Sequence, residues 1–363
     1  MLRTPIAFLV FLLPHFAVPA SAQNFPALSG EIEIELQVDR VYDPPAGARR
    51  RTTGFAEIEM GLGLALTEAL SISSTFKIEP RREHAGSALF RSEGGVVEEL
   101  FLRYAKDDFS VLGGKFSPGF GIAWDAAPGI YGSEFAEDYE LTERLGGGIA
   151  YNLDAETLGK HRIGLNVFTL DTTLLSESIG SRPVFGAEGT ERPGRFRRWQ
   201  GGAGNTGSLD SVSVTLDGSE VQALWGLSYH LGYRHQPKGV DGVADEKGYA
   251  AALKYDFEID WDTKLTPLVE YVELRKFGGL DRKARYITAA AVFETGPWEF
   301  SASTTLRRIT APDTERVSDW LRTIGVAYSF TDDLKLSAAW ARSRQEGAST
   351  SVFGVQLRYG IEF

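Results

Sequence analysis

The sequence predicts an all-β protein: a closed antiparallel transmembrane β-barrel of about sixteen strands, with a third long loop that folds inward. Three observations predict this fold. Apolar and polar residues alternate along many segments, those segments are too long for ordinary soluble strands, and the connections between them alternate between short and long. Each observation is weak alone, because each has another explanation, but together they favour a barrel.

The alternation is clearest at the two ends of the predicted barrel. In residues 31–39 every second residue is apolar, and the others are acidic or amide side chains. Residues 353–363 repeat the pattern and end on Phe363. Period 2 places the two classes on opposite faces of a strand. A soluble β-sandwich would alternate in the same way, so this pattern predicts strands but not yet a barrel.

The length of the segments favours a membrane barrel. Most are about nine to fourteen residues long, whereas soluble strands average five or six and a tilted strand crossing a bilayer needs about nine to eleven. The predicted strands are residues 31–41, 52–65, 70–79, 96–105, 109–116, 144–152, 162–170, 209–217, 221–234, 248–258, 263–274, 285–293, 298–308, 319–330, 334–344 and 351–363.

The connections give an independent test. Those that follow even-numbered strands are short, and those that follow odd-numbered strands are mostly longer; residues 117–143 and 171–208 are the two longest. Short turns at one rim and long loops at the other are typical of outer-membrane barrels. A sandwich gives no reason for this order.

The N-terminus predicts export. Arg3 precedes the apolar run 6–13, and small residues 20–22 follow it, which is the form of a secretory signal peptide cleaved after Ala22. The run is too short to cross a bilayer as a helix. We therefore expect residues 1–22 to be the signal and residues 23–363 to be the barrel, located in the bacterial outer membrane.

Composition excludes some functions. The chain has 38 Lys and Arg against 49 Asp and Glu, a formal net charge of −11, which argues against nucleic-acid binding. The 40 glycines and 12% aromatic residues suit a large barrel with aromatic belts. Tyr and Trp near predicted strand ends, such as Tyr104, Tyr151, Trp298 and Tyr359, are the belt candidates.

Two stretches resemble known proteins. The terminal Phe363 after alternating apolar residues resembles the C-terminal signature of bacterial outer-membrane proteins, which implies contact with their assembly machinery. Residues 98–104 and 109–121, with the segment Gly-Lys-Phe-Ser-Pro-Gly-Phe-Gly at 114–121, resemble the phosphate-selective porin family over about 25 residues. That resemblance implies a sixteen-stranded, trimeric barrel whose third loop narrows the pore.

The charges depart from that family, which lines its pores with Arg and Lys. The predicted wall carries Glu33, Glu35, Glu57 and Glu59, and the third loop carries six further acids. Rings of acidic side chains favour cations. The predicted constriction residues of the loop are Asp125, Glu134, Glu137, Asp138 and Glu140. They are expected to face Arg103 and Lys115, with Lys77 also on the wall; alternatively the loop lies outside the pore and its acids are solvated.

The fourth long loop is basic, with Arg182, Arg192, Arg195, Arg197 and Arg198. These side chains would bind lipopolysaccharide phosphates, line an anion-attracting vestibule, or simply be solvated.

No enzyme is predicted. The histidines have no metal-ligand spacing, no Ser–His pair with a positioned acid stands out, and no catalytic residue, metal or cofactor is expected. The prediction is a porin for passive diffusion of small hydrophilic solutes or ions, with cation preference. The alternatives are a channel specific for phosphate, sugars or carboxylates, a non-conducting structural or adhesive barrel, and a soluble exported β-protein.

Overall fold

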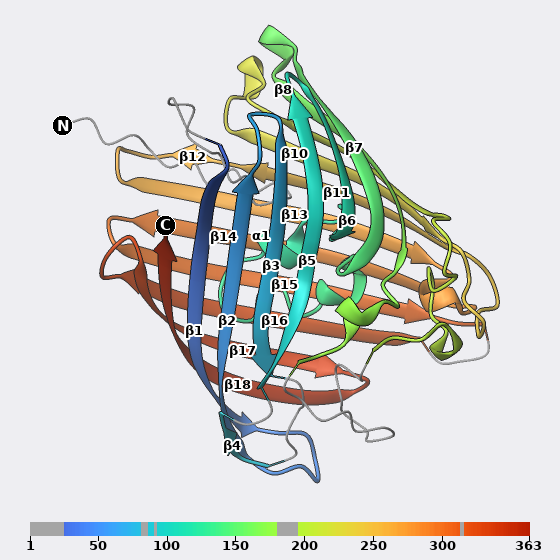
Figure 1. Cartoon of the computed structure of the whole chain (residues 1–363). Coiled ribbons are helices and arrows are strands. Elements are labelled where there is room, and N and C mark those ends of the chain that lie inside the picture. The colour runs from blue at the N-terminus through green and yellow to red at the C-terminus, as the bar shows by residue number, and fades with distance from the viewer. Residues whose placement is uncertain (1–24, 81–85, 91–92, 180–194, 313–315) are drawn as a thin grey trace.

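A computed structural model describes residues 25–80, 86–90, 93–179, 195–312 and 316–363. The predicted signal segment 1–22 therefore lies outside the described residues, as do Arg182 and Arg192 of the basic loop. The described chain forms one sheet of eighteen strand segments, two of which, β4 and β12, have two residues each. The other sixteen strands form the wall of an antiparallel barrel (Figure 1).

The barrel closes because its first and last strands pair with each other, from Glu31 with Glu362 to Asp43 with Ser351. Closure leaves no sheet edge, which is the condition that a lipid environment sets for β-structure. Every neighbouring pair of long strands is antiparallel.

The strands are β1 Ala27–Asp43, β2 Arg51–Ala65, β3 Leu70–Pro80, β4 Ala88–Leu89, β5 Glu93–Lys106, β6 Phe109–Phe116, β7 Arg144–Asp154, β8 Lys160–Leu170, β9 Ser211–Ser219, β10 Leu227–Gln236, β11 Glu246–Tyr255, β12 Phe257–Glu258, β13 Thr263–Arg275, β14 Lys283–Thr295, β15 Trp298–Thr310, β16 Val317–Ser329, β17 Leu334–Gln345 and β18 Ala348–Glu362. Fifteen of the sixteen predicted strands begin and end within four residues of these bounds. The exception is the ninth predicted strand, which corresponds to β10 and begins at Leu227 rather than Val221 because a 3-10 turn at Gln222–Leu224 occupies that stretch.

The predicted order of connections is confirmed with one exception. Turns such as 107–108 and 296–297 lie at one rim, whereas residues 117–143, 171–179 and 195–210 lie at the other. The exception is the last connection at the long-loop rim, between β17 and β18, which is only residues 346–347. The described helices are all short. The longest is the α-helix α1 at Ala123–Ala126, which has four residues. No helix within the described ranges is long and apolar enough to cross a membrane.

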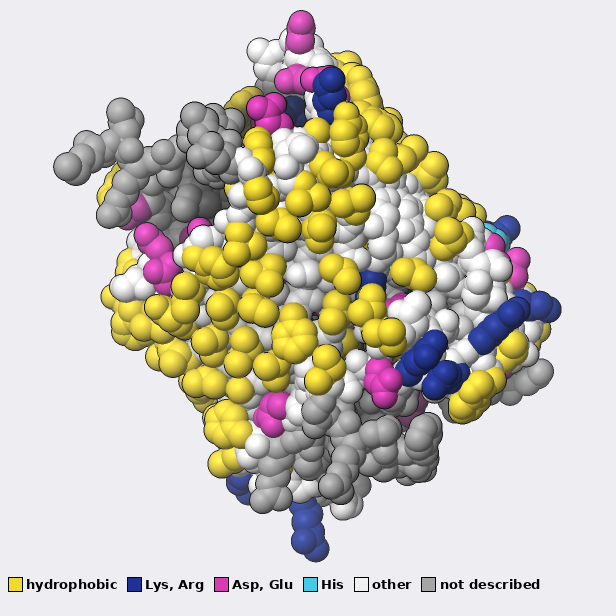
Figure 2. All heavy atoms as spheres, in the orientation of Figure 1, with side chains coloured by type: hydrophobic (Ala, Val, Ile, Leu, Met, Phe, Trp, Pro, Cys, Tyr) yellow, Lys and Arg dark blue, Asp and Glu magenta, His cyan; other side chains and the backbone are white. Residues whose placement is uncertain are grey.

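The outer surface is apolar. Hydrophobic side chains gather across the face formed by β1, β2, β3 and β5, and charged side chains gather mainly toward the ends of the barrel (Figure 2). On β18 the alternate residues Phe353, Val355, Leu357 and Tyr359 are 37–46% exposed. At the short-turn rim, Trp298 packs edge-on against Tyr328, with ring centroids 4.8 Å apart. An apolar wall with an aromatic rim is the surface that lipid requires, so the chain has the architecture of an outer-membrane barrel.

Candidate functional site

An acidic patch lines the inner face of the first strands. Glu33 of β1 lies opposite Glu59 of β2, and Glu35 lies opposite Glu57. Like charges directly across a sheet repel. Lys77 of β3 offsets this repulsion, since its Nζ lies 2.7 Å from Glu57 and 3.7 Å from Glu59. The structure thus brings these five predicted wall residues together in one group, which we call the acidic wall patch.

Residues 117–143, which we call the loop, are held against the opposite wall by a buried carboxylate. Glu270 of β13 is 1% exposed. It accepts hydrogen bonds from the backbone N–H of Ile122 at 2.5 Å and of Ala123 at 3.2 Å. It also accepts one from the Tyr139 hydroxyl at 2.5 Å. One side chain therefore fixes both ends of the loop's central turn.

β10 supplies two more anchors. The buried ring of His230 has Nε2 2.6 Å from the carbonyl oxygen of Phe120 and Nδ1 2.6 Å from Asp217. Arg234 donates to the carbonyl oxygen of Tyr139 at 2.6 Å, and its other terminal nitrogen pairs with Glu246 at 2.6 Å. Bonds of this kind to charged groups are stronger than neutral ones.

The position between these two anchors must be glycine. A Cβ on Gly232 would lie 1.9 Å from the carbonyl oxygen of Phe120. The wall and the loop therefore approach each other too closely for any side chain at residue 232.

Further anchors hold the second half of the loop. Asp138 accepts from the Tyr286 hydroxyl and from Arg307, both at 2.9 Å, and Arg307 also pairs with Asp319 at 2.8 Å. The Tyr131 hydroxyl donates to Asp39 of β1 at 2.5 Å.

Glu134 accepts a weaker bond, at 3.3 Å, from Gln345 of β17. The wall residues in all these contacts alternate along their strands with the exposed apolar side chains, so the contacts lie on the inner face.

Apolar packing completes the attachment. Phe120 and Tyr139 join a buried cluster with Val272 and Leu274 of β13 and Tyr286 of β14. These three wall side chains are at most 1% exposed. Burying a large apolar side chain stabilises by about 1.5–3 kcal/mol, so the loop is fixed by apolar contacts as well as by polar ones.

All five predicted loop acids are exposed or half-buried, and Glu134 and Asp138 among them make the wall contacts described above. Asp125 and Glu137 are exposed, and Glu140 is half-buried. Burial and, to a smaller extent, the charges of Glu98 and Glu137 together raise the pKa of Glu140 to about 8, whereas Lys77 of the acidic wall patch opposes the shift. The same interactions place Glu140 near Lys77. We had expected the loop acids to face Arg103 and Lys115, but in the structure Asp138 pairs with Arg307.

The expectation for Lys115 is wrong. Its side chain is 0% exposed, so it lines no pore. Its Nζ lies 2.9 Å from Glu143 and 3.3 Å from Asp171, and donates to the carbonyl oxygen of Leu175. In the strand register Lys115 pairs with Leu100, which is 39% exposed, so residue 115 lies on the outer face. The chain around residues 171–175 covers it there.

This buried ion pair predicts a large loss of stability on substitution. Lys115→Met leaves two buried carboxylates without their cation, so we expect unfolding in detergent to become easier by about 3–5 kcal/mol. Lys160→Met is the matched control, because Lys160 forms an exposed pair with Glu220 and should change stability by no more than about 1 kcal/mol. Equal unfolding free energies in denaturant titrations of the two variants would contradict the assignment.

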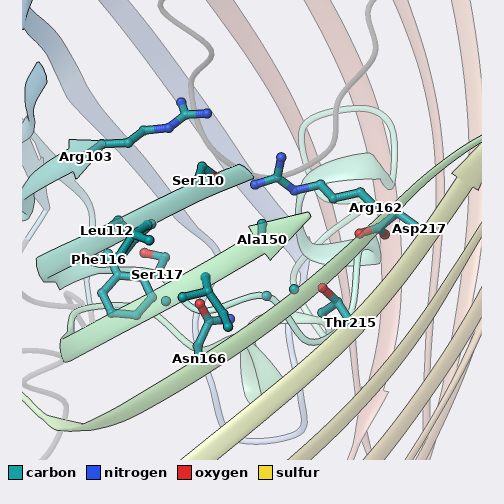
Figure 3. Close-up of a pocket in the computed structure, with 15 residues that line it drawn as sticks. Arg103, Ser110, Leu112, Phe116, Ser117, Ala150, Arg162, Asn166, Thr215 and Asp217 are labelled. Atoms are coloured by element: carbon teal, nitrogen blue, oxygen red, sulfur yellow. The ribbon is translucent and has the colours of Figure 1, made fainter. Parts of the chain in front are cut away.

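A pocket in the wall near the short-turn rim holds two arginines. Arg103 of β5 and Arg162 of β8 extend toward each other above Ser110 and Ala150 (Figure 3). Ser117, Asn166, Thr215 and Asp217 also contribute polar side chains to its lining. The alternation along β5 places Arg103 on the face opposite the exposed Leu102 and Tyr104, whereas we had not singled out Arg162.

The anchoring residues were also missed. Period 2 would have put His230, Arg234 and Glu270 on the inner face, but nothing in the sequence assigns them to residues 95–148 positions away. Among the described residues, no three His, Cys, Asp or Glu side chains form a group that could hold a metal ion.

Comparisons with known proteins show the fold. No family model matches the chain, and no curated protein sequence matches it. Among solved structures, it is similar to OprB of Pseudomonas putida (TM-score 0.60, 10% identity, covering 92% of this chain and 94% of that one). It is also similar to the outer membrane channel DcaP of Acinetobacter baumannii (0.55, 8%, 92% and 96%). A third is the anion-selective porin of Comamonas acidovorans (0.51, 13%, 92% and 99%).

Proposed function

We propose that the chain is an outer-membrane porin that lets small hydrophilic solutes and ions diffuse passively through a water-filled passage. One observation carries the proposal. The loop is bonded to the inner face at β10, β13, β14 and β15, with further bonds to β1 and β17, and the side chains of Asp125, Glu137 and Glu140 on it are exposed or half-buried. The loop then narrows the lumen without filling it, and the passage runs between those acids and the acidic wall patch.

We further propose a preference for cations. The narrow passage has carboxylates on both sides, because the loop acids lie across from Glu33, Glu35, Glu57 and Glu59. A low-dielectric opening focuses the field of such charges and concentrates the ion of opposite sign. Lys77 and Arg358, which pairs with Glu33, reduce this field locally but do not reverse it, because the carboxylates outnumber them. No catalysis is part of this proposal.

Similarity to a solved structure also supports a proposal about the oligomeric state. An outer membrane protein of Vibrio cholerae, OmpT, is similar to this chain (TM-score 0.55, 10% identity, covering 92% of this chain and 99% of that one) and was solved in a trimer form. We propose a homotrimer here, exported through cleavage of residues 1–22, inserted by the assembly machinery through Phe363 and surrounded by outer-membrane lipid and lipopolysaccharide.

Reversal potentials test the proposal. The purified chain in a planar bilayer, under a tenfold KCl gradient, should give discrete conductance steps and a reversal potential of the sign that indicates cation flow. Liposomes containing it should swell in small sugars. Absence of both conductance and swelling would support a non-conducting structural barrel instead. A reversal potential of the sign that indicates anion flow would contradict the proposed cation preference but not the proposed porin.

One observation favours a second function. Arg103 and Arg162 face one pocket with Asn166, an arrangement that suits a carboxylate or phosphate group. A substrate-specific channel for such anions is the alternative. Under it, phosphate or a small carboxylate would block the current of other ions at millimolar concentration, and Arg162→Gln would relieve the block.

The raised pKa of Glu140 predicts a pH dependence. Glu140 is mostly protonated below pH 8 and ionised above it. The proposed cation preference should therefore increase as pH rises from about 6.5 to 9.5, because a carboxylate appears in the passage. Reversal potentials over this range check it, and Glu140→Gln should flatten the change. A wild-type profile that is already flat would contradict the assignment.

A further inference from the structure

The outer wall carries a group of basic residues close to the long-loop rim. Lys247 of β11, Arg275 of β13, Lys283 and Arg285 of β14 and Arg308 of β15 lie within three residues of the strand ends at that rim. We call these five the basic belt. Because the chain as a whole has a net charge of −11, the belt does not reflect its general composition.

The belt faces outward. Its residues alternate with side chains that point into the barrel: Val272, Leu274 and Ala284 are 0% exposed, and Arg307 reaches Asp138 of the loop. In contrast, Arg275, Arg285 and Arg308 are exposed. The belt therefore lies on the surface that meets the membrane.

The strand register sets like charges directly opposite one another. Arg275 pairs across the sheet with Lys247 on one side and Lys283 on the other. Arg285 pairs with Arg308. Side chains in such positions are about 5 Å apart at Cβ, and like charges there destabilise the sheet. An anion outside the sheet would remove this repulsion.

One buried carboxylate organises the cations. Glu273, which is 7% exposed, accepts from Nε of Arg275 at 2.9 Å and from Nε of Arg285 at 3.0 Å, and pairs with Lys283 at 2.6 Å. It also accepts from the Tyr271 hydroxyl. Three cations around one acid leave a net positive charge of two. The contacts use the Nε atoms, so the terminal nitrogens of both guanidiniums are the ones offered to a phosphate.

Apolar side chains continue down the wall below the belt. Val269 and Tyr271 of β13, Ile287 of β14 and Leu306 of β15 are 40–52% exposed, and each lies on the outward face of its strand. A ligand bound here would meet cations at its head and apolar surface beneath. This combination fits an amphiphile with an anionic headgroup and acyl chains rather than a free anion.

We propose that the basic belt binds the phosphate groups of an acylated outer-leaflet lipid of the lipopolysaccharide type, with Glu273 positioning Arg275, Lys283 and Arg285. The site does not depend on whether the pore conducts. Arg322 of β16 and Arg342 of β17, another outward pair of like charges in direct register, extend the same surface around the barrel.

Titration of the folded, detergent-solubilised chain with bis-phosphorylated lipid A, followed by native mass spectrometry, tests the site. Arg275→Gln with Arg285→Gln should raise the apparent Kd at least tenfold. Glu273→Gln should also weaken binding, although it makes the surface more positive, because the cations lose their positioning. The matched control, Lys106→Gln with Lys160→Gln, removes two exposed charges at the opposite rim and should change the Kd less than twofold.

A second binding measurement uses only the wild-type chain. Dephosphorylated lipid A should bind the wild-type chain at least tenfold more weakly than the phosphorylated form, whether or not the variants fold. Equal binding of the two lipids, or equal weakening in the belt and control variants, would overturn the proposal. A lipid-independent dimer that the belt variant abolishes would also overturn it, because the belt would then be an interface between copies of the chain.

Discussion

Replacement of Glu270 by alanine is expected to detach the loop and to raise single-channel conductance by about twofold or more, since the constriction sets the resistance of a pore. Glu270 satisfies the N–H groups of Ile122 and Ala123 and the Tyr139 hydroxyl. Its loss leaves three buried donors without an acceptor. At about 1–3 kcal/mol for each, the docked loop would lose about 3 kcal/mol or more.

The measurement is conductance in a planar bilayer, together with thermal unfolding of the same preparation. Glu294→Ala on β14 is the matched control, because Glu294 is an exposed glutamate of the neighbouring strand at the far rim. Gly232→Ala tests the same attachment without removing a charge, since its Cβ would meet the carbonyl oxygen of Phe120. Wild-type conductance in both Glu270→Ala and Gly232→Ala would show that the loop does not set the resistance of the pore.

Neutralising the accessible loop acids should abolish the cation preference. The triple variant Asp125→Asn, Glu137→Gln, Glu140→Gln lacks three carboxylates on one side of the passage, whereas Lys77 on the other side keeps its charge. We expect the cation-to-anion permeability ratio to fall by about threefold or more, toward one, because the field in a low-dielectric constriction is set by its nearest charges. Reversal potentials at pH 9.5, where Glu140 is ionised in the wild type, give the largest difference.

A control with the same change in net charge separates the constriction from the protein's overall field. Asp107→Asn with Asp108→Asn and Glu156→Gln removes three acids from the short turns at the far rim. This variant should retain most of the selectivity. If it loses as much as the loop variant, selectivity comes from the charge of the pore mouth, and the proposed role of the loop acids fails.

The amino-acid sequence by itself determined the barrel. Alternation over 31–39 and 353–363 fixed which face of each strand meets lipid, because a shift of one residue would turn every side chain to the wrong side. Segment length and the order of short and long connections then distinguished a membrane barrel from a sandwich. The apolar stretch from Val221 to Gly226 contains a 3-10 turn instead of strand, so this reasoning extended β10 too far.

Only the tertiary structure decided what the inward side chains do. Lys115 shows the reason. We expected it to be a cation in the pore, but residues of a different loop cover its side chain, which forms a buried ion pair with Glu143 and Asp171. Glu270 shows the converse, because its partners lie 131–148 residues away in the chain. Strand periodicity depends on nearest neighbours, whereas the attachment of a loop to a wall depends on side chains that only closure of the barrel brings within a few ångströms of one another.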